Sequence, residues 1–177
     1  MNDFINILKM FIDSKETIAL YLNPDDPNMF VVGEVLNVSE EYFLIKMTDP
    51  YGRHDGYLLN NIEDITKIET DSIYLNKLLQ ISDQLSMNII FSDKEDILHQ
   101  VLTYLYEHEV LATFSFLSSE HKVIGYIQSI QDGLIFVKQI NNDGKVDGKV
   151  IFQLDYLSWL TWDTDDETRL SKLENIN

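Results

Sequence analysis

The chain matches itself when it is shifted along its own sequence by 92 residues. The segment VVGEVLNVSEEYFLIKMTDPYGRHDG (31–56) then falls on VIGYIQSIQDGLIFVKQINNDGKVDG (123–148) without a gap, and the apolar positions keep the same phase. Such self-similarity indicates a duplicated structural unit, and a period of about 90 residues is too long for a solenoid. We therefore predict two copies of one small domain, at residues 1–88 and 89–177. The identical pairs are Val31 and Val123, Gly33 and Gly125, Lys46 and Lys138, Gly52 and Gly144, Asp55 and Asp147, and Gly56 and Gly148.

Both copies have the same predicted layout: an N-terminal helix, five short, strongly bent antiparallel strands and a C-terminal helix. The fold class is therefore α+β, mainly β. The first helix is capped by Asn2 or Asp3, and the second follows a capping box formed by Ser92 and Glu95. The predicted strands cover 17–22, 30–38, 42–47, 57–62 and 64–69, and then 111–116, 122–130, 134–139, 149–154 and 156–161. The closing helices are predicted over about 71–85 and from about 165 onward.

Apolar residues at helical spacing mark the buried faces of the predicted helices. These residues are Phe4, Ile5, Leu8, Phe11 and Ile12 in the first helix, Leu75, Leu78 and Leu79 in the closing helix of the first copy, and Ile97, Leu98, Val101, Leu102 and Leu105 in the opening helix of the second. The segment QLSMNIIFSD (84–93) between the copies has no Pro or Gly, unlike a flexible linker. We expect its apolar residues, Met87, Ile89, Ile90 and Phe91, to be buried.

The motif Gly-x-x-Asp-Gly occurs at 52–56 and again at 144–148. Glycine readily adopts positive φ, and an Asp side chain can hydrogen-bond the backbone of a turn. We therefore predict that each motif forms the hairpin connection between the third and fourth strands. His54 stands beside Asp55 and resembles a catalytic pair, but Val146 occupies the equivalent position in the second copy. A solvated turn is the favoured interpretation.

The chain carries 30 acidic and 13 basic residues, a formal net charge of −17, and its lysines are scattered. This charge repels nucleic acid and anionic membranes at long range. Cysteine is absent, which excludes disulfides and thiolate metal sites and fits a reducing compartment. No apolar run is long enough to span a membrane, and the N-terminus lacks the pattern of a signal peptide. We therefore expect a cytoplasmic protein without a membrane partner.

A helix followed by five short strands, with a glycine in the bent second strand, resembles the Sm-like fold, which includes the bacterial host-factor RNA chaperones. Gly33, Val35 and Val38 fit the apolar-x-Gly-x-apolar-x-x-apolar part of the first family motif, as do the residues 92 positions later. The resemblance covers residues 14–69 and 108–161. It implies two tandem, diverged Sm-like units, each partly barrel-like.

The resemblance does not extend to the residues with which the family binds RNA in a ring of subunits. Three family features are missing from both copies: the motif Asp, the base-contacting Asn and the Arg-Gly pair of the second motif. In their places stand Ser39 and Gln131, Phe43 and Ile135, and Thr66-Lys67 and Ser158-Trp159. The resemblance therefore implies the fold without the usual RNA site, and we do not expect tight RNA binding.

The acidic run DTDDE (163–167) has oxygen ligands but lacks the mid-loop glycine and the spacing of an EF-hand calcium loop. Acidic residues in the first turn of a helix explain the run better. The sequence holds no glycine-rich phosphate loop and no motif of a serine hydrolase or zinc protease. We therefore expect no cofactor, no metal site and no enzymatic activity.

The segment YLSWLTW (156–162) places Trp159 where the first copy has Lys67. If Lys67 faces solvent, Trp159 does so too unless something covers it. Coverage by the C-terminal helix or by the other copy is one interpretation. A contact with a partner or a second subunit is the other, because Trp is enriched at binding hot spots.

These observations favour a non-enzymatic intracellular protein-interaction or assembly module, since the edge strands of small barrels pair readily with other strands. Its expected partner is a protein or a second copy of the chain. The predicted partner-binding residues are Trp159, Trp162, Arg53 and His54. The alternative is a single-stranded RNA-binding Sm-like protein with a non-standard site, which would need a basic groove and stacked aromatic residues.

Overall fold

The computed structural model describes residues 3–26, 28–82, 89, 91–92, 96–117 and 121–174. The protein is α+β and mainly β, and it divides into two compact units, Met1–Ile97 and Leu98–Asn177. The sequence predicted a boundary between residues 88 and 89, and residue 88 lies outside the described part of the chain.

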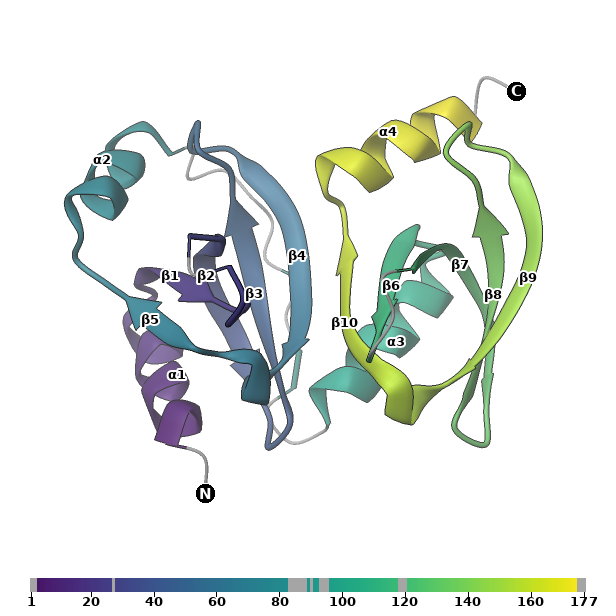
Figure 1. Cartoon of the computed structure of the whole chain (residues 1–177), viewed down its shortest axis with the longest axis horizontal. Helices are drawn as coiled ribbons and strands as arrows, with labels where there is room; N and C mark the ends of the chain where they lie inside the picture. The colour runs from purple at the N-terminus through teal and green to yellow at the C-terminus, as the bar shows by residue number, and fades with distance from the viewer. Residues whose placement is uncertain are drawn as a thin grey trace. The chain divides into compact units, whose positions relative to one another are not determined.

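The first unit is a curved antiparallel sheet with a helix at each end of its sequence (Figure 1). Its strands follow the order β5-β1-β2-β3-β4, so the last strand returns to pair with the first, and Ala19 of β1 faces Glu69 of β5. A short 3-10 helix at Ile62–Asp64 leads from β4 to β5. The elements are α1 (Asp3–Ser14), β1 (Thr17–Tyr21), β2 (Phe30–Val38), β3 (Tyr42–Thr48), β4 (His54–Asn61), β5 (Lys67–Glu69) and α2 (Ile73–Ile81).

The second unit has the same sequence of elements and the equivalent strand order, β10-β6-β7-β8-β9. A 3-10 helix at Leu154–Tyr156 again precedes the last strand. The elements are α3 (Ile97–Glu107), β6 (Ala112–Phe116), β7 (Lys122–Gln131), β8 (Leu134–Ile140), β9 (Val146–Gln153), β10 (Leu157–Trp162) and α4 (Asp165–Glu174).

The strand registers of the first unit recur in the second at a constant offset. The bulge between β2 and β3 follows the Val35–Ile45 pair, and the bulge between β7 and β8 follows the pair 92 residues further on. The first strands are offset by 94 residues, since Ile18 of β1 and Ala112 of β6 face the equivalent glycines. The connection between the first two strands of the second unit is therefore shorter, while the pairing itself is unchanged.

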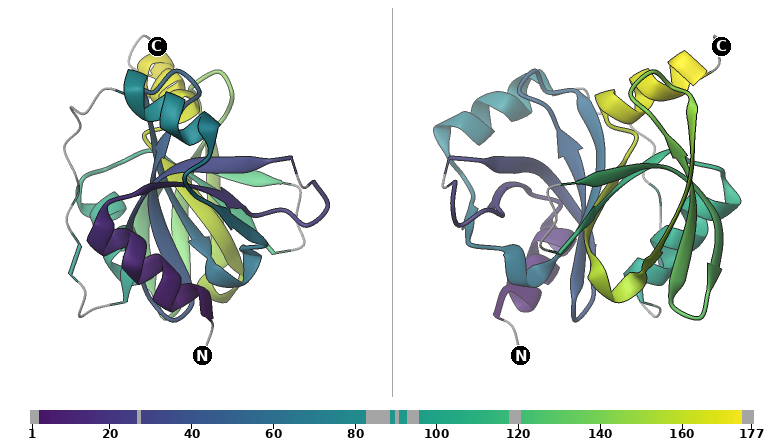
Figure 2. Two further views of the ribbon diagram at one scale, coloured as in Figure 1. Left: turned by 90° about the vertical axis from the view of Figure 1, so that its left-hand side faces the viewer. Right: turned by 45° about the vertical axis from the view of Figure 1, so that its right-hand side comes forward.

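The glycine in the second strand of each unit allows a close approach between backbones. A Cβ at Gly33 would lie 2.0 Å from the Lys46 carbonyl oxygen, and a Cβ at Gly125 would lie 2.2 Å from the Lys138 carbonyl oxygen. No other residue has room at these positions, because every other residue carries a Cβ. The curvature of the sheets, visible in Figure 2, depends on this approach.

One side chain holds the turn between β3 and β4. Asp49 Oδ1 accepts hydrogen bonds from the backbone N–H groups of Tyr51 at 2.8 Å and Arg53 at 2.9 Å. Asn141 holds the equivalent turn between β8 and β9 in the same way, with both bonds at 3.0 Å. The sequence assigned this role to the motif residue Asp55, which instead lies in β4. That prediction was wrong because an Asx side chain caps N–H groups that follow it in the turn.

The motif glycines do adopt positive φ, as predicted: φ is 81° at Gly52 and 73° at Gly144. A Cβ at Gly52 would lie 2.9 Å from the carbonyl oxygen of Ile81, at the end of α2. A Cβ at Gly144 would lie 2.8 Å from Leu173 Cβ in α4. In each unit, therefore, the hairpin turn packs against the C-terminal end of the closing helix, and Figure 2 shows α4 beside the β8–β9 turn.

The helices confirm most of the predicted apolar faces. All five predicted residues of α3 are buried, and so are Leu8, Leu75 and Leu78. The other four predicted residues of α1, Phe4, Ile5, Phe11 and Ile12, are half-buried, and Leu79 of α2 is exposed, at 50%. Ile89 and Phe91 are half-buried rather than buried, and the other predicted residues of that segment, together with Glu95 of the expected capping box, lie outside the described residues.

Replacing Gly33 or Gly125 by alanine is expected to destabilise the protein by about 2–4 kcal/mol, because the new Cβ must push the facing backbone away. Chemical denaturation of each variant measures this change. The control is Gly133→Asn in the β7–β8 turn, where a Cβ would meet nothing within 4 Å. Asn tolerates positive φ, so this control should cost less than about 1 kcal/mol. Equal losses in the control and the strand variants would contradict the close-approach explanation.

Candidate functional site

The two predicted tryptophans occupy different environments. Trp162 is fully buried, with its ring centroid 6.4 Å from that of Tyr104 in α3, so its side chain is not presented to a partner. Trp159 is half-buried and carries the Lys122 ammonium group 4.8 Å from its ring centroid. Of this predicted pair, only Trp159 offers part of its ring at the surface.

Arg53 and His54, the other predicted partner-binding residues, lie at the turn between β3 and β4. Arg53 Nε donates to Asp49 Oδ2 at 2.7 Å, and the His54 ring stands edge-on to Tyr57 with centroids 5.0 Å apart. Burial alone would raise the pKa of Asp49, but hydrogen bonds from Arg53 and Tyr51 outweigh burial and hold this pKa below its usual value. Arg53 therefore has a structural task in the turn, whatever else it contacts.

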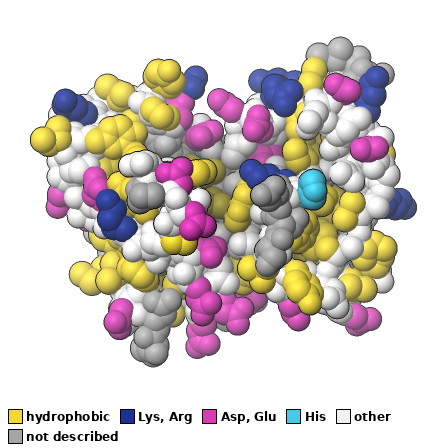
Figure 3. All heavy atoms as spheres, in the orientation of Figure 1, with side chains coloured by type: hydrophobic (Ala, Val, Ile, Leu, Met, Phe, Trp, Pro, Cys, Tyr) yellow, Lys and Arg dark blue, Asp and Glu magenta, His cyan; other side chains and the backbone are white. Residues whose placement is uncertain are grey.

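An exposed apolar surface lies beside this turn, on the outer side of α2. We name it the α2 face and define it as Phe30, Pro50, Ile73, Tyr74 and Ile81. Ile73 is 76% exposed and Ile81 59% exposed. Phe30 and Tyr74 pack edge-to-face with centroids 5.9 Å apart, and Pro50, Tyr74 and Ile81 line a hollow of about 290 Å³. In Figure 3 hydrophobic side chains gather at the upper left, where Figure 1 places α2.

The fold does not require the α2 face to be apolar. The second unit builds the same helix, α4, with polar residues at nearly all the equivalent positions. Counted 92 residues further on, the α2 face corresponds to Lys122, Asn142, Asp165, Asp166 and Leu173. An apolar exposed surface costs solubility, so its presence in one unit alone indicates a task for that surface.

The acidic run at 163–167 forms the start of α4, and its last residue is buried. Glu167 is 3% exposed, and its carboxylate accepts hydrogen bonds from the hydroxyl groups of Thr113 and Thr161 and from the N–H and hydroxyl groups of Thr164. Thr164 precedes the helix and Glu167 is its third residue, so the two form a capping box. The carboxylate thereby ties α4 to β6 and β10.

The first unit fills the same place with apolar groups. Leu75 stands 92 residues before Glu167, and Ala19 stands 94 residues before Thr113. Leu75 and Ala19 belong to one buried apolar cluster. The same contact between helix and strand is therefore made by dispersion and burial in one unit and by hydrogen bonds in the other.

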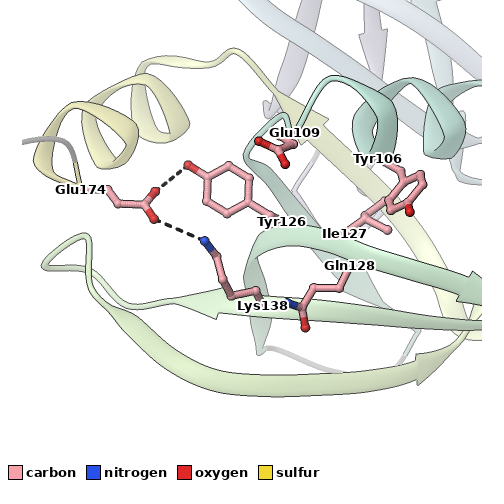
Figure 4. Close-up of a pocket in the computed structure, with 7 residues that line it drawn as sticks. All are labelled: Tyr106, Glu109, Tyr126, Ile127, Gln128, Lys138 and Glu174. Atoms are coloured by element: carbon pink, nitrogen blue, oxygen red, sulfur yellow. Dashed lines mark hydrogen bonds and ion pairs between the residues drawn. The ribbon is translucent and has the colours of Figure 1, made fainter.

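A polar cavity of about 550 Å³ lies in the second unit, and no motif in the sequence predicted it. Glu174 at the end of α4 joins two of its lining residues: Tyr126 donates to Glu174 Oε2 at 2.6 Å, and Lys138 Nζ lies 3.5 Å from Oε1 (Figure 4). Burial, the hydrogen bond to Glu174 and the charge of Glu174 together raise the pKa of Tyr126 to about 12. The remaining lining residues are Tyr106, Glu109, Ile127 and Gln128.

The two residues that the resemblance aligns with the base-contacting Asn of Sm-like proteins are buried. Phe43 and Ile135 are both fully buried, so neither side chain can contact a nucleotide in this structure. Among the described residues, no helix combines the length and the apolar character that a membrane crossing requires. No three His, Asp or Glu side chains of the described ranges gather where they could hold a metal ion.

Sequence reasoning missed both the α2 face and the cavity. The signal for the α2 face is the helix sequence IYLNKLLQI, which is apolar on more than the one side that Leu75 and Leu78 use. The cavity has no such signal, because Tyr126, Lys138 and Glu174 come from three separate elements.

Comparisons of the chain with models of protein families, with curated proteins and with solved structures found no match. The functional assignment therefore rests on the geometry of the α2 face and of the cavity in the second unit.

Replacing Glu167 by leucine is expected to destabilise the protein by about 2–4 kcal/mol, because the buried hydroxyl groups lose their acceptor and α4 loses its cap. The double variant Thr113→Ala/Glu167→Leu recreates the Ala19–Leu75 contact of the first unit. It should recover at least about 1 kcal/mol of that loss, which urea denaturation of the two variants measures. Simple addition of the two single effects would contradict the equivalence of the two contacts.

Stability is expected to fall at high pH through Tyr126. Its folded-state pKa of about 12 exceeds that of an unfolded tyrosine, about 10, so the folded state keeps a proton that the unfolded state loses. This contribution is complete below about pH 10 and is lost as the pH rises through about 12. Urea denaturation of the wild type and Tyr126→Phe across this range measures the difference, which should shrink as the pH rises. A difference that stays constant would show that the phenol is not held by Glu174.

Proposed function

We propose that the chain is a non-enzymatic interaction module, built of two tandem Sm-like units, that binds a partner protein through the α2 face. Support for the Sm-like assignment comes from the strand order and from the registers that recur 92 residues apart. The single observation that carries the function is the exposed apolar surface on α2, where the equivalent surface of α4 is polar.

The shape and chemistry of the α2 face favour one class of partner. A hollow between a helix and a turn is suited to the apolar side of an amphipathic helix. It is lined by the apolar residues Pro50, Tyr74, Leu78 and Ile81 and by the polar residues Lys77 and Gln80. Tyr74 and Phe30 supply rigid aromatic surface, which contributes strongly to binding hot spots. The net charge of −17 attracts a partner that is basic. The proposed partner is therefore a basic amphipathic helix.

RNA binding is the weaker candidate. The net charge opposes it, and Phe43 and Ile135 are buried where the family places its base-contacting Asn. Arg53 is bonded to Asp49 in the turn, and Lys77 lines the hollow itself. The net charge and the two buried side chains favour a protein partner.

The test is a double variant, Ile73→Asp/Tyr74→Asp, which gives α2 the residues that begin α4. Both acids lie in the first helical turn, where they suit the helix dipole, so the fold should persist. The probe is a fluorescent amphipathic helical peptide of leucine and lysine, with a scrambled peptide of the same composition as its counterpart. Fluorescence polarisation should show selective binding of the amphipathic peptide to the wild type and a loss of about tenfold or more in the variant.

The matched control is Val146→Asp/Ile151→Asp, which adds the same charge at two exposed apolar residues of β9. This control should bind the peptide as the wild type does, or slightly more tightly, because the added negative charge attracts the basic peptide. Equal losses in both double variants, or equal binding of both peptides, would show that the α2 face does not dock a helix. Retention of U-rich or A-rich RNA at physiological salt would favour the alternative instead.

A further inference from the structure

The cavity of the second unit has the size of a small-molecule site. Its volume of about 550 Å³ falls within the range of about 300–1,000 Å³ that is typical of such sites. Its floor is formed by Tyr126 and Ile127 of β7, Lys138 of β8 and Glu174 of α4, and its rim by Tyr106, Glu109 and Gln128. Figure 4 shows these side chains converging from different elements.

The floor of the cavity is internally satisfied. Both oxygens of Glu174 are engaged, one by the Tyr126 hydroxyl and one by Lys138 Nζ, which also lies 4.6 Å from the Tyr126 ring centroid. The Lys138 charge is thereby neutralised by Glu174. A ligand that enters the cavity therefore meets a charge-balanced floor, and its own charge has to be recognised at the rim.

The rim offers an exposed carboxylate, Glu109, which in Figure 4 points away from the Tyr106 ring. The Glu109 side chain makes no hydrogen bond or ion pair with any described residue. An unpaired carboxylate recognises an organic ammonium group through a charge-assisted hydrogen bond.

The first unit has the same elements but carries different residues at most of these rim and floor positions. Lys15 stands at the equivalent of Glu109, 94 residues earlier, and both adopt positive φ at the end of their helices, 54° and 49°. The same helix end therefore carries opposite charges in the two units. The equivalents of Tyr126 and Glu174, counted 92 residues earlier, are Glu34 and Ser82. Only the lysine of the floor is shared.

We propose that this cavity binds a small organic cation that carries a primary ammonium group, with Glu109 as the counter-ion. Gln128 and the Tyr126 hydroxyl stand ready to hydrogen-bond the remainder of the ligand. The acidic protein concentrates such cations around itself, while an anionic ligand would be repelled. This site lies in the second unit and is independent of the function proposed for the α2 face.

The test uses 1,4-diaminobutane as the probe and 1,4-butanediol as its neutral counterpart. Two-dimensional NMR of the intact chain should show saturable shifts at the cavity residues with the diamine, at a dissociation constant of about 1 mM or tighter, and none with the diol. Glu109→Gln should weaken diamine binding by about tenfold, and Glu109→Lys, which copies the first unit, should abolish it.

The matched control is Glu107→Gln, which removes the same charge from an exposed residue of α3 that does not line the cavity. It should leave diamine binding unchanged within about twofold. Equal weakening by the two glutamine variants would mean that the diamine is only a diffuse counter-ion, and shifts that the diol also produces would remove the role of Glu109. Either result, or no saturable shift at all, would overturn the proposal. Thermal melts of each variant check that the fold is retained.

Discussion

The architecture of both units depends on the close approach of a glycine in the second strand to the backbone of the third strand. A Cβ at Gly33 would lie 2.0 Å from a carbonyl oxygen of β3, and the second unit repeats this arrangement at Gly125. Because the glycine has no side chain, the second and third strands can approach each other closely enough for the sheet to curve. The hairpin that follows then reaches the end of the closing helix, where Gly52 and Gly144 allow a second close contact.

On this shared backbone the two units use different side chains for equivalent contacts. Leu75 packs against strand β1 in the first unit, while Glu167 accepts hydrogen bonds from threonines of β6 and β10 in the second. The closing helix is apolar on its outer side in one unit and charged in the other. These substitutions leave the fold intact because the backbone contacts at the glycines do not depend on them. They give each unit a distinct surface, an apolar face in the first and a polar cavity in the second.

The sequence predicted a structural feature correctly where that feature depends on the backbone conformation of one residue or on residues within one helical turn. The two strand glycines, the positive φ of the motif glycines and the acidic start of α4 are of this kind. The predictions failed where a neighbour in space decided the outcome. Trp162 is buried against Tyr104 from a distant helix, and Leu79 is exposed because no other segment of the described chain covers that flank of α2.

The sequence by itself determined the order and type of the helices and strands, the recurrence after 92 residues and the strong negative charge. Each follows from backbone stereochemistry, hydrophobic periodicity or simple counting. Only the tertiary structure decided that Asp49 rather than Asp55 holds the turn, and that Tyr126, Lys138 and Glu174 meet at one cavity. These outcomes depend on which elements the curved sheet brings together, and residues that are far apart in the sequence carry no local signal of the contact that they will make.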